Sequence, residues 1–395
     1  MKILMCCTHH FGSDRQVGSQ HIARNFCREG NEVHYLSAPL TPLHLLERQT
    51  QDLKTRYRIA REGVTHLNGR LTESIPLALF APCGVFPLNK MAVLRNWSRF
   101  VIAHSISTVL KAQPFDVVYI DNIFLGWLLD KVQYRTSVMR VMDRHDQFPG
   151  WASNAKQLAR EVSEKCDLTV YSARGLEAYV KELGAQESFL VPNGVDYEFF
   201  RQVGAPDSSF AKRNRPVVAY SGTLDDRIDV GLVKYVAAAL PQYSFEFFGP
   251  QSEGFSPDGF PDNVIFHGSV PHADLPAILH QADIGFIPFD IHRAKERLSG
   301  VRPLKLLEYM ASGLPVVCAR WPEVERMKSP AKLFSTPNEC VEMLKLVELE
   351  KQSHAIEKEY ARQADWSHMC SQLMDEIEKR AEPRAHETTP SLQSL

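Results

Sequence analysis

Lys305 and Glu308, a lysine and a glutamate three positions apart, have the spacing that most clearly suggests chemistry in this chain. Pro303 and Gly313 bracket them and suit the first position and the C-terminal cap of a helix, so the sequence predicts a short helix over Pro303–Ser312. The free N–H groups at its start can bind an anion. Lys305 can add charge beside a phosphate, and Glu308 can accept hydrogen bonds from ribose hydroxyls. Taken alone, Lys-x-x-Glu is more often an exposed ion pair.

The elements that would position this helix alternate regularly along the chain. Short runs of strand type, such as Met1–Cys7, Val117–Ile120 and Val138–Met142, alternate with amphipathic stretches, and the rhythm restarts at Val217–Tyr220. Such alternation predicts parallel sheets with helices on both faces. We therefore predict an α/β chain with two Rossmann-like, doubly wound domains facing across a cleft, where ligands bind at the carboxyl ends of strands.

The length of 395 residues suits two domains of ordinary size. The stretch 201–216 breaks the alternation with Gly204, Pro206 and two serines, which is typical of a linker. The predicted divisions are an N-terminal domain at 1–200, a linker at 201–216, a C-terminal nucleotide-binding domain at 217–355, a helix returning to the N-terminal domain at 356–380, and a disordered tail at 381–395.

Composition and charge exclude several classes of protein. The formal net charge of -2 gives no global attraction to nucleic acid, so no nucleic-acid partner is predicted. The eight cysteines form no CxxC pair and have no histidine at zinc-ligand spacing, so we predict buried thiols in a reducing, cytoplasmic compartment and no metal site. The N-terminal sequence lacks the features of a signal peptide, and no uncharged apolar run reaches about 18 residues, so no transmembrane helix is predicted.

Two regions of the first half fit the alternation poorly. One is a basic cluster of Arg48, Lys54, Arg56, Arg58 and Arg61. The other, Ile75–Phe100, combines apolar residues with Arg95, Trp97 and Arg99, a composition that suits a membrane interface. Peripheral contact with the cytoplasmic face of the inner membrane is one interpretation. An insertion that packs on its own domain, with a solvated basic face, is the other.

Three motifs carry a resemblance to a known family. The segment Pro303–Val317 (PLKLLEYMASGLPVV) looks like the donor-site helix of GT-B glycosyltransferases, and Pro192–Asp196 (PNGVD) is similar to the turn that ends their first domain. Asp274–Ala277 and Ala282–Phe289 resemble a helix and a strand of their second domain. Within the family, the chain most resembles bacterial exopolysaccharide transferases of the kind that assemble xanthan, including a glucuronosyltransferase.

The resemblance implies a role for individual residues. Lys305 would hold the diphosphate of a nucleotide sugar and Glu308 its ribose. Arg140–Asp143 falls where the exopolysaccharide transferase has a strand ending in a catalytic aspartate, so Asp143 would be the general base, with Asp146 as the competing base. An N-cap or a loop hydrogen bond is the structural alternative for Asp143. The full set of candidate donor-site residues is Gly222, Thr223, Arg227, Gly249, Arg302, Lys305, Leu306 and Glu308.

His9 and His10 end the first expected strand, at the cleft. A single histidine there is usually structural, but a pair at the carboxyl end of a strand favours contact with the acceptor or the donor. Their segment, Thr8–Phe11, is similar to Ser-His-Asp-Phe in the exopolysaccharide transferase. A metal site formed by the two histidines is not predicted, because Asp14 is the only carboxylate nearby.

The chain departs from retaining members of the family at two positions. Those members have a glutamate where this chain has Gly300, and an Arg and a Lys after the strand where this chain has only Arg227. Lys295, Arg297 and Arg302 could supply the missing positive charge. An inverting mechanism is therefore favoured over a retaining one.

The predicted function is transfer of a sugar from a nucleotide diphosphate donor, of the UDP type, to a saccharide or lipid-linked saccharide in polysaccharide assembly. No cofactor is predicted besides the nucleotide sugar, which is a co-substrate, and the enzyme is expected to work without a metal. Two alternatives stay open: a nucleotide-sugar 2-epimerase on the same fold, and a non-catalytic subunit of a polysaccharide assembly complex.

Overall fold

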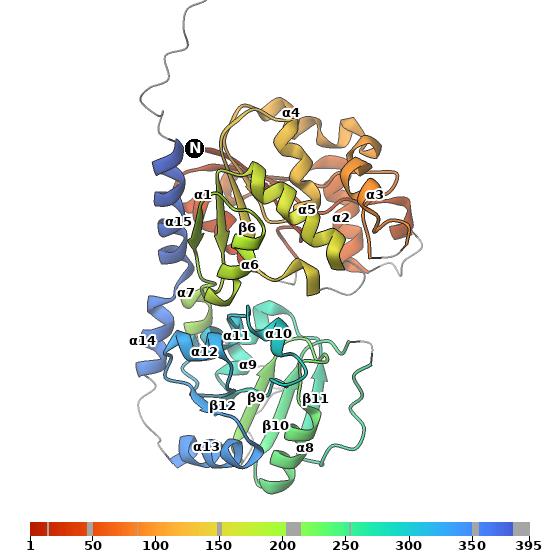
Figure 1. Cartoon of the computed structure of the whole chain (residues 1–395). Coiled ribbons are helices and arrows are strands. Elements are labelled where there is room, and N and C mark those ends of the chain that lie inside the picture. The colour runs from red at the N-terminus through yellow and green to blue at the C-terminus, as the bar shows by residue number, and fades with distance from the viewer. Residues whose placement is uncertain are drawn as a thin grey trace, which may run out of the picture.

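The computed structural model describes residues 1–13, 16–45, 50–84, 86–147, 152–202, 215–252, 254–349 and 355–381. Figure 1 shows two α/β units, one above the other, with the long helical C-terminal segment running along one side of both. Each unit has its own sheet of mainly parallel strands flanked by helices, which confirms the predicted α/β class. Most of the predicted linker and nearly all of the predicted tail lie outside the described residues.

The first sheet has eight strands in the order β3-β4-β2-β1-β5-β6-β7-β8. Neighbouring strands are parallel except for β3 and β4. The chain leaves β1 to one side for β2 and later returns to its other side for β5, so a switch point lies between β1 and β5, where ligands bind in such sheets. The strands are β1 (Lys2–Cys6), β2 (Glu32–Leu36), β3 (Val64–His66), β4 (Leu71–Ser74), β5 (Phe115–Ile120), β6 (Tyr134–Val141), β7 (Leu168–Tyr171) and β8 (Ser188–Leu190).

The helices between these strands are α1 (Gly18–Arg28), α2 (Gln51–Glu62), α3 (Met91–Asn96), α4 (Ser107–Ala112), α5 (Ala152–Lys165), α6 (Glu177–Glu182) and α7 (Tyr197–Arg201). A 3-10 helix, Ile123–Asp130, follows β5. Another 3-10 turn, Arg174–Leu176, leads directly into α6.

The second sheet has six parallel strands in the order β11-β10-β9-β12-β13-β14, with its switch point beside β9. The strands are β9 (Val217–Ser221), β10 (Ser244–Phe248), β11 (Val264–Gly268), β12 (Ile284–Ile287), β13 (Val316–Ala319) and β14 (Lys332–Phe334). The helices are α8 (Val230–Ala239), α9 (Leu275–Leu279), α10 (Lys295–Leu298), α11 (Leu304–Ala311), α12 (Pro322–Met327), α13 (Pro337–Leu349), α14 (Ala355–Gln363) and α15 (Trp366–Ala381).

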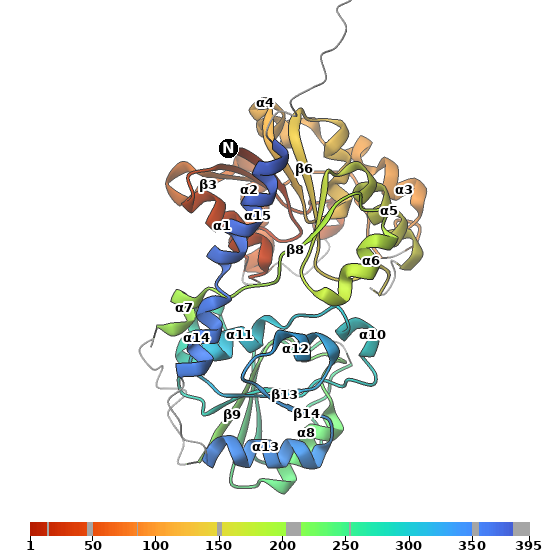
Figure 2. The same ribbon diagram turned by 60° about the vertical axis from the view of Figure 1, so that its left-hand side comes forward.

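The last two helices belong to different halves of the molecule. Helix α14 packs against α11, whereas α15 packs against α1, β5 and β6, as both orientations of the ribbon show (Figure 2). Trp366, Leu373 and Ile377 of α15 are buried in one apolar cluster with Ile3 and Phe26. The C-terminal helix therefore completes the core of the first domain.

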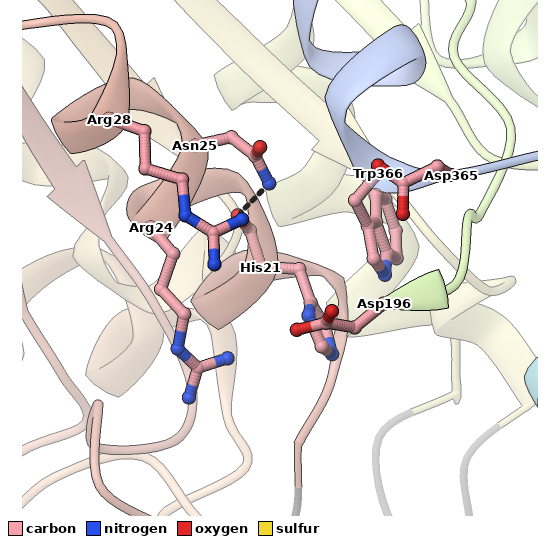
Figure 3. A pocket seen from close by; sticks show the side chains of 7 residues that line it. All are labelled: His21, Arg24, Asn25, Arg28, Asp196, Asp365 and Trp366. Atoms are coloured by element: carbon pink, nitrogen blue, oxygen red, sulfur yellow. Dashed lines mark hydrogen bonds between the residues drawn. The ribbon is translucent and has the colours of Figure 1, made fainter. Parts of the chain in front are cut away.

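Two chain crossings join the domains, and they run side by side. Val195 N–H donates to the Ala364 carbonyl and Trp366 N–H to the Val195 carbonyl, each at 3.0 Å. Figure 3 shows this junction, where the ring of His21 stacks on Trp366 with 5.4 Å between ring centroids. The pocket there has room for about 10 Å³, roughly one water molecule. It is a packed hinge rather than a ligand site.

A second contact joins the domains through Glu323, which is buried on α12. Its two carboxylate oxygens accept the N–H groups of Arg174 (3.1 Å) and Gly175 (3.0 Å), at the start of the turn before α6. Gly175 must lack a side chain, because a Cβ atom there would lie 1.7 Å from the carbonyl oxygen of Ser299.

The poorly fitting regions of the first half are resolved as elements of the first domain. Lys54, Arg56, Arg58 and Arg61 lie on α2, and Arg48 lies outside the described residues. The composition of its segment suggested that Trp97 lies at a membrane interface. The structure instead buries this residue: it is 1% exposed, and its indole N–H donates to the Phe124 carbonyl at 3.0 Å. No helix within the described ranges is long and apolar enough to cross a membrane.

Candidate functional site

A cavity of about 730 Å³ lies between the two domains. Residues after β1, β5 and β6 line it from the first domain, and residues after β9 and at the start of α11 line it from the second. The cavity thus joins the carboxyl ends of strands from both sheets, next to both switch points, which is where α/β proteins bind ligands.

Helix α11 begins at the cavity because of Pro303. The proline is the N-cap (φ -73°, ψ 118°) rather than the first helical residue that its type suggested, since this ψ lies outside the helical range. At the other end, Gly313 takes a positive φ of 83°. Gly313 N–H donates to the Met310 carbonyl and Leu314 N–H to the Tyr309 carbonyl, the pattern of a Schellman cap. The first N–H groups of α11 are therefore free of helix partners beside the cavity.

Lys305 and Glu308 both line the cavity from α11. The Lys305 ammonium lies over two aromatic rings, 5.1 Å from the centroid of Tyr220 and 4.9 Å from that of Phe289. Burial lowers the pKa of Lys305, and the nearby Arg227 lowers it further, while Glu308 opposes both effects. Burial raises the pKa of Glu308, and Lys305 partly offsets this. A bound dianion would favour the charged form of Lys305.

Gly222 brings backbone close to the lysine. Its φ is 136°, and a Cβ atom there would lie 3.1 Å from Lys305 Cε. Gly249 does not line the cavity. It packs behind Gly222, where a Cβ atom would lie 2.0 Å from the Gly222 carbonyl oxygen. Thr223 lines the cavity, whereas Leu306 is 0% exposed in the core of the second domain.

Two arginines bring positive charge to the second-domain wall. Arg227 lines the cavity and is held by Asp225, whose carboxylate accepts from Nε (2.9 Å) and Nη2 (2.6 Å). Arg302 also lines the cavity, and its Nε donates to the Asn193 carbonyl at 3.2 Å. Lys295 and Arg297 do not line it, and Arg297 pairs with Asp226 at 2.7 Å.

Asp143 faces the cavity from the end of β6. The surrounding protein raises the pKa of its carboxyl to about 6 by displacing water, although Arg227 and Arg140 act in the opposite direction. A carboxyl with this pKa is mostly ionised at neutral pH, yet basic enough to accept a proton.

Asp146 lies outside the cavity, in a 3-10 turn. Its carboxylate accepts from Arg144 Nε (3.1 Å) and Nη2 (2.9 Å), and this pairing lowers its pKa. Of the two histidines, His9 lines the cavity and His10 does not. His10 is 5% exposed and bonds through Nε2 to Asp52 of α2 at 2.8 Å, so it fastens the loop to the domain.

The sequence reasoning missed Asp121 and Asn122, which line the first-domain wall. The N–H groups of both donate to the Cys6 carbonyl at 2.9 Å, which joins the ends of β5 and β1. Burial raises the pKa of Asp121, against the effects of Arg140 and of a hydrogen bond from Ser19. The signal that could have found them is a polar pair directly after the buried strand Val117–Ile120.

Gly300, where retaining relatives have a glutamate, lies at a contact between the domains. A Cβ atom there would be 2.6 Å from Leu176 Cδ2 of the first domain. Gly300 does not line the cavity. In this arrangement of the domains, a longer side chain at position 300 would displace Leu176.

Two family models match the chain, one in each half. Residues 5–136 match a model described as the N-terminal domain of the glucuronosyltransferase GumK. Residues 230–379 match a model described as glycosyl transferase-like.

Two known sequences are similar to part of the chain. A Bacillus subtilis (strain 168) protein named as a teichuronic acid biosynthesis glycosyltransferase, TuaH, is 30% identical over 154 residues, which is 37% of this chain and 38% of the relative. The UDP-glucuronate:glycolipid 2-beta-glucuronosyltransferase of Xanthomonas campestris pv. campestris is 32% identical over 142 residues, which is 36% of this chain and 33% of the relative. The matches thus span little more than a third of these relatives' length.

The whole chain resembles solved structures at the level of fold. One is Anabaena Alr3699/HepE in complex with UDP, which superposes with a TM-score of 0.63 at 13% identity and covers 96% of this chain and 100% of that one.

Proposed function

We propose that this chain, which belongs to the GT-B glycosyltransferases, transfers a sugar from a UDP-sugar to a hydroxyl of a saccharide or lipid-linked saccharide in polysaccharide assembly. The observation that carries the proposal is the start of α11, where free N–H groups, Lys305 and Glu308 meet the cavity beside Gly222. A diphosphate needs the positive charge and the close backbone approach, and a ribose needs the carboxylate. The relatives named above act in polysaccharide or glycolipid synthesis, which supports the class of acceptor.

The cavity suggests how the reaction would proceed. Asp143 would take the proton of the acceptor hydroxyl as its oxygen attacks the anomeric carbon and the bond from that carbon to the phosphate oxygen breaks. Lys305, Arg227 and the N-terminus of α11 would stabilise the charge that develops on the departing UDP. These groups supply the charge that a metal supplies in other transferases, so we propose transfer that does not depend on a metal ion.

We propose inversion at the anomeric carbon. Asp143 supplies a base on the first-domain wall, opposite the donor helix on the second-domain wall. Gly300 packs against Leu176, so there is no room for a side chain at the position where retaining relatives have a glutamate. An NMR spectrum that shows the product with the donor's own anomeric configuration would overturn this part of the proposal.

We also propose that the first domain touches the cytoplasmic face of the membrane. Leu79, Phe100 and Ile102 are 62%, 38% and 46% exposed, and they lie on two short segments paired by a hydrogen bond from Leu79 N–H to the Phe100 carbonyl (3.0 Å). Phe86, in the loop between them, is 71% exposed, and the Lys90 ammonium lies 5.3 Å from its ring centroid. Exposed apolar side chains with lysine nearby fit an anionic lipid surface.

A thermal-shift screen with UDP-, GDP- and ADP-sugars tests the donor class. We expect UDP-sugars to stabilise the protein by about 2.7 kcal/mol at 100 times their dissociation constant. Lys305→Ala should weaken UDP binding at least about tenfold, because it removes a charge-assisted contact. Lys295→Ala, a lysine on neighbouring α10 outside the cavity, is the matched control.

The binding screen, together with turnover assays with and without an acceptor, separates the alternatives. Failure of every nucleotide sugar to bind would favour a non-catalytic subunit, and sugar isomerisation without an acceptor would favour a 2-epimerase. Equal effects of Lys305→Ala and Lys295→Ala would contradict the assignment of α11 as the donor helix. Loss of activity in a chelator would contradict the metal-free mechanism.

A further inference from the structure

Asn193 connects the two halves of the cavity. It belongs to the Pro192–Asp196 turn between the domains, and it lines the cavity. Its side-chain oxygen accepts from Arg140 Nη2 at 2.8 Å, and its side-chain nitrogen donates to the Arg302 carbonyl at 3.4 Å. Its backbone carbonyl accepts from Arg302 Nε at 3.2 Å. One residue therefore touches both the first and the second domain through an amide.

Each partner of Asn193 leads directly to a part of the site. Arg140 is on β6, three residues before Asp143, and is 1% exposed. Its guanidinium packs against Gly18 of α1, where a Cβ atom would lie 2.3 Å from Nη1, so only a glycine leaves room for it. Arg302 comes immediately before Pro303, the N-cap of α11. The amide thus links the end of the strand that carries Asp143 to the start of the helix that carries Lys305.

We propose that Asn193 is a positioning residue, which holds the donor helix in register with Asp143 through Arg140 and Arg302. This inference rests on the proposed function. An amide suits the site because its oxygen accepts from Arg140 while its nitrogen donates to the Arg302 carbonyl, so one planar group serves both partners. Asn193 acts on turnover by fixing the distance between base and donor, and small displacements of reacting groups are costly.

The test compares Asn193→Ala with the wild type. We expect the kcat of UDP-sugar turnover to fall about 10- to 100-fold. The dissociation constant of UDP should stay within about threefold, because Lys305, Glu308, Gly222 and the helix N-terminus all belong to the second domain. In hydrogen exchange, the amides of residues 308–311, whose N–H groups bond within α11, should exchange faster, because the side-chain tie at the start of α11 is gone.

Asn263→Ala is the matched control. Asn263 is a buried asparagine, and its side chain donates to the carbonyls of Ala237, Leu240 and Tyr243 at 3.0–3.1 Å, inside the second domain. Its removal should lower Tm without lowering kcat. It should speed hydrogen exchange around the residues that Asn263 contacts rather than in α11. If Asn193→Ala does not fold, Asn193→Asp keeps an acceptor for the buried Arg140 and removes the donor to Arg302.

Three results would overturn the inference: an unchanged kcat, a loss of UDP affinity equal to the loss of kcat, or unchanged exchange at residues 308–311. The inference and the proposed function fail in different ways. A wild-type protein that binds UDP but shows no effect of Asn193→Ala removes only the role of Asn193. A wild-type protein that does not bind UDP or any UDP-sugar contradicts the proposed function itself.

Discussion

Two aspartates three positions apart show how environment decides the role of a residue. Asp143 opens to the cavity, and loss of water around it raises its pKa to about 6. Asp146 pairs with Arg144, which lowers its pKa. A carboxylate that is already bonded to a guanidinium is a poor proton acceptor, so of these two aspartates Asp143 is the one that fits the proposed role of general base.

Asp143→Asn should lower kcat about 10²- to 10⁴-fold, the usual range for loss of a general base. In the wild type, kcat/KM should rise with pH through about 6 and then level off, because the protonated carboxyl below this pH cannot accept the acceptor's proton. The rise should disappear in Asp143→Asn. Measurement of kcat/KM from pH 4.5 to 8 checks both expectations.

Asp146→Asn is the control for that experiment, since it changes the same atoms outside the cavity. Its kcat should stay within about threefold of the wild type. An equal loss in both variants would mean that the turn after β6, rather than the Asp143 carboxylate, is what turnover needs.

At the scale of single residues, the sequence indicated the second-domain wall of the cavity better than the first-domain wall. Lys305 and Glu308 stand in a motif with a cap at each end, so their common face could be predicted from helix geometry. Asp121 and Asn193 take their places from contacts distant in sequence: Asp121 N–H binds Cys6, and the Asn193 amide binds Arg140 and Arg302. A local pattern can place Asp121 at the end of a strand, but it carries no signal for these distant contacts.

At the scale of elements, the poorly fitting region holds the exposed apolar patch of the first domain. The segments around Leu79 and Phe100 pair only briefly, through isolated bridges such as Ala78 with Val101. Trp97 and Leu94 fill the core beneath, while Leu79 stays in solvent. The composition of this region is apolar and aromatic, but its residues follow no helical or strand period, so buried aromatic residues could not be told from exposed ones.

The double variant Leu79→Ser/Phe86→Ser should reduce binding to phosphatidylglycerol vesicles at least about tenfold, because each side chain buried in lipid contributes about 1.5–3 kcal/mol. Vesicle sedimentation measures this. The control is Ile356→Ser, an equally exposed apolar residue (63%) on α14 of the second domain.

If the wild-type protein binds neutral phosphatidylcholine vesicles as tightly as phosphatidylglycerol vesicles, the charge of the lipid plays no part in binding. Wild-type protein that stays in the supernatant with both lipids would contradict membrane contact altogether.

At the scale of the molecule, the domains are joined at a hinge and held together by Glu323. The hinge is the paired crossing at Val195 and Trp366, and Glu323 binds the N–H groups of Arg174 and Gly175 elsewhere on the interface. Alternation of strands and helices predicted two such units. It could not predict how they meet, because a contact such as that of Gly175 with Ser299 depends on tertiary packing.

Glu323→Ala should let the two domains move apart. Hydrogen bonds to a charged group contribute about 1.5–3 kcal/mol each, so loss of both should reduce the closed population at least about tenfold. Small-angle scattering of the ligand-free protein should then give a larger radius of gyration. Glu325→Ala, on the same helix but paired with Arg320 at 3.0 Å, should leave the curve unchanged. Identical scattering from both variants and the wild type would show that Glu323 does not hold the domains together.

The position of α15 has a consequence for how the protein is made. The ribosome releases the chain from the N-terminus, yet the apolar face formed by Ile3 and Phe26 is covered by Leu373 and Ile377. During synthesis this face stays uncovered until α15 is made, and by then the whole second domain has been produced and can fold first. The domain that begins the chain is thus the last to be finished, and a nascent chain stalled before α15 would present an open apolar surface to chaperones.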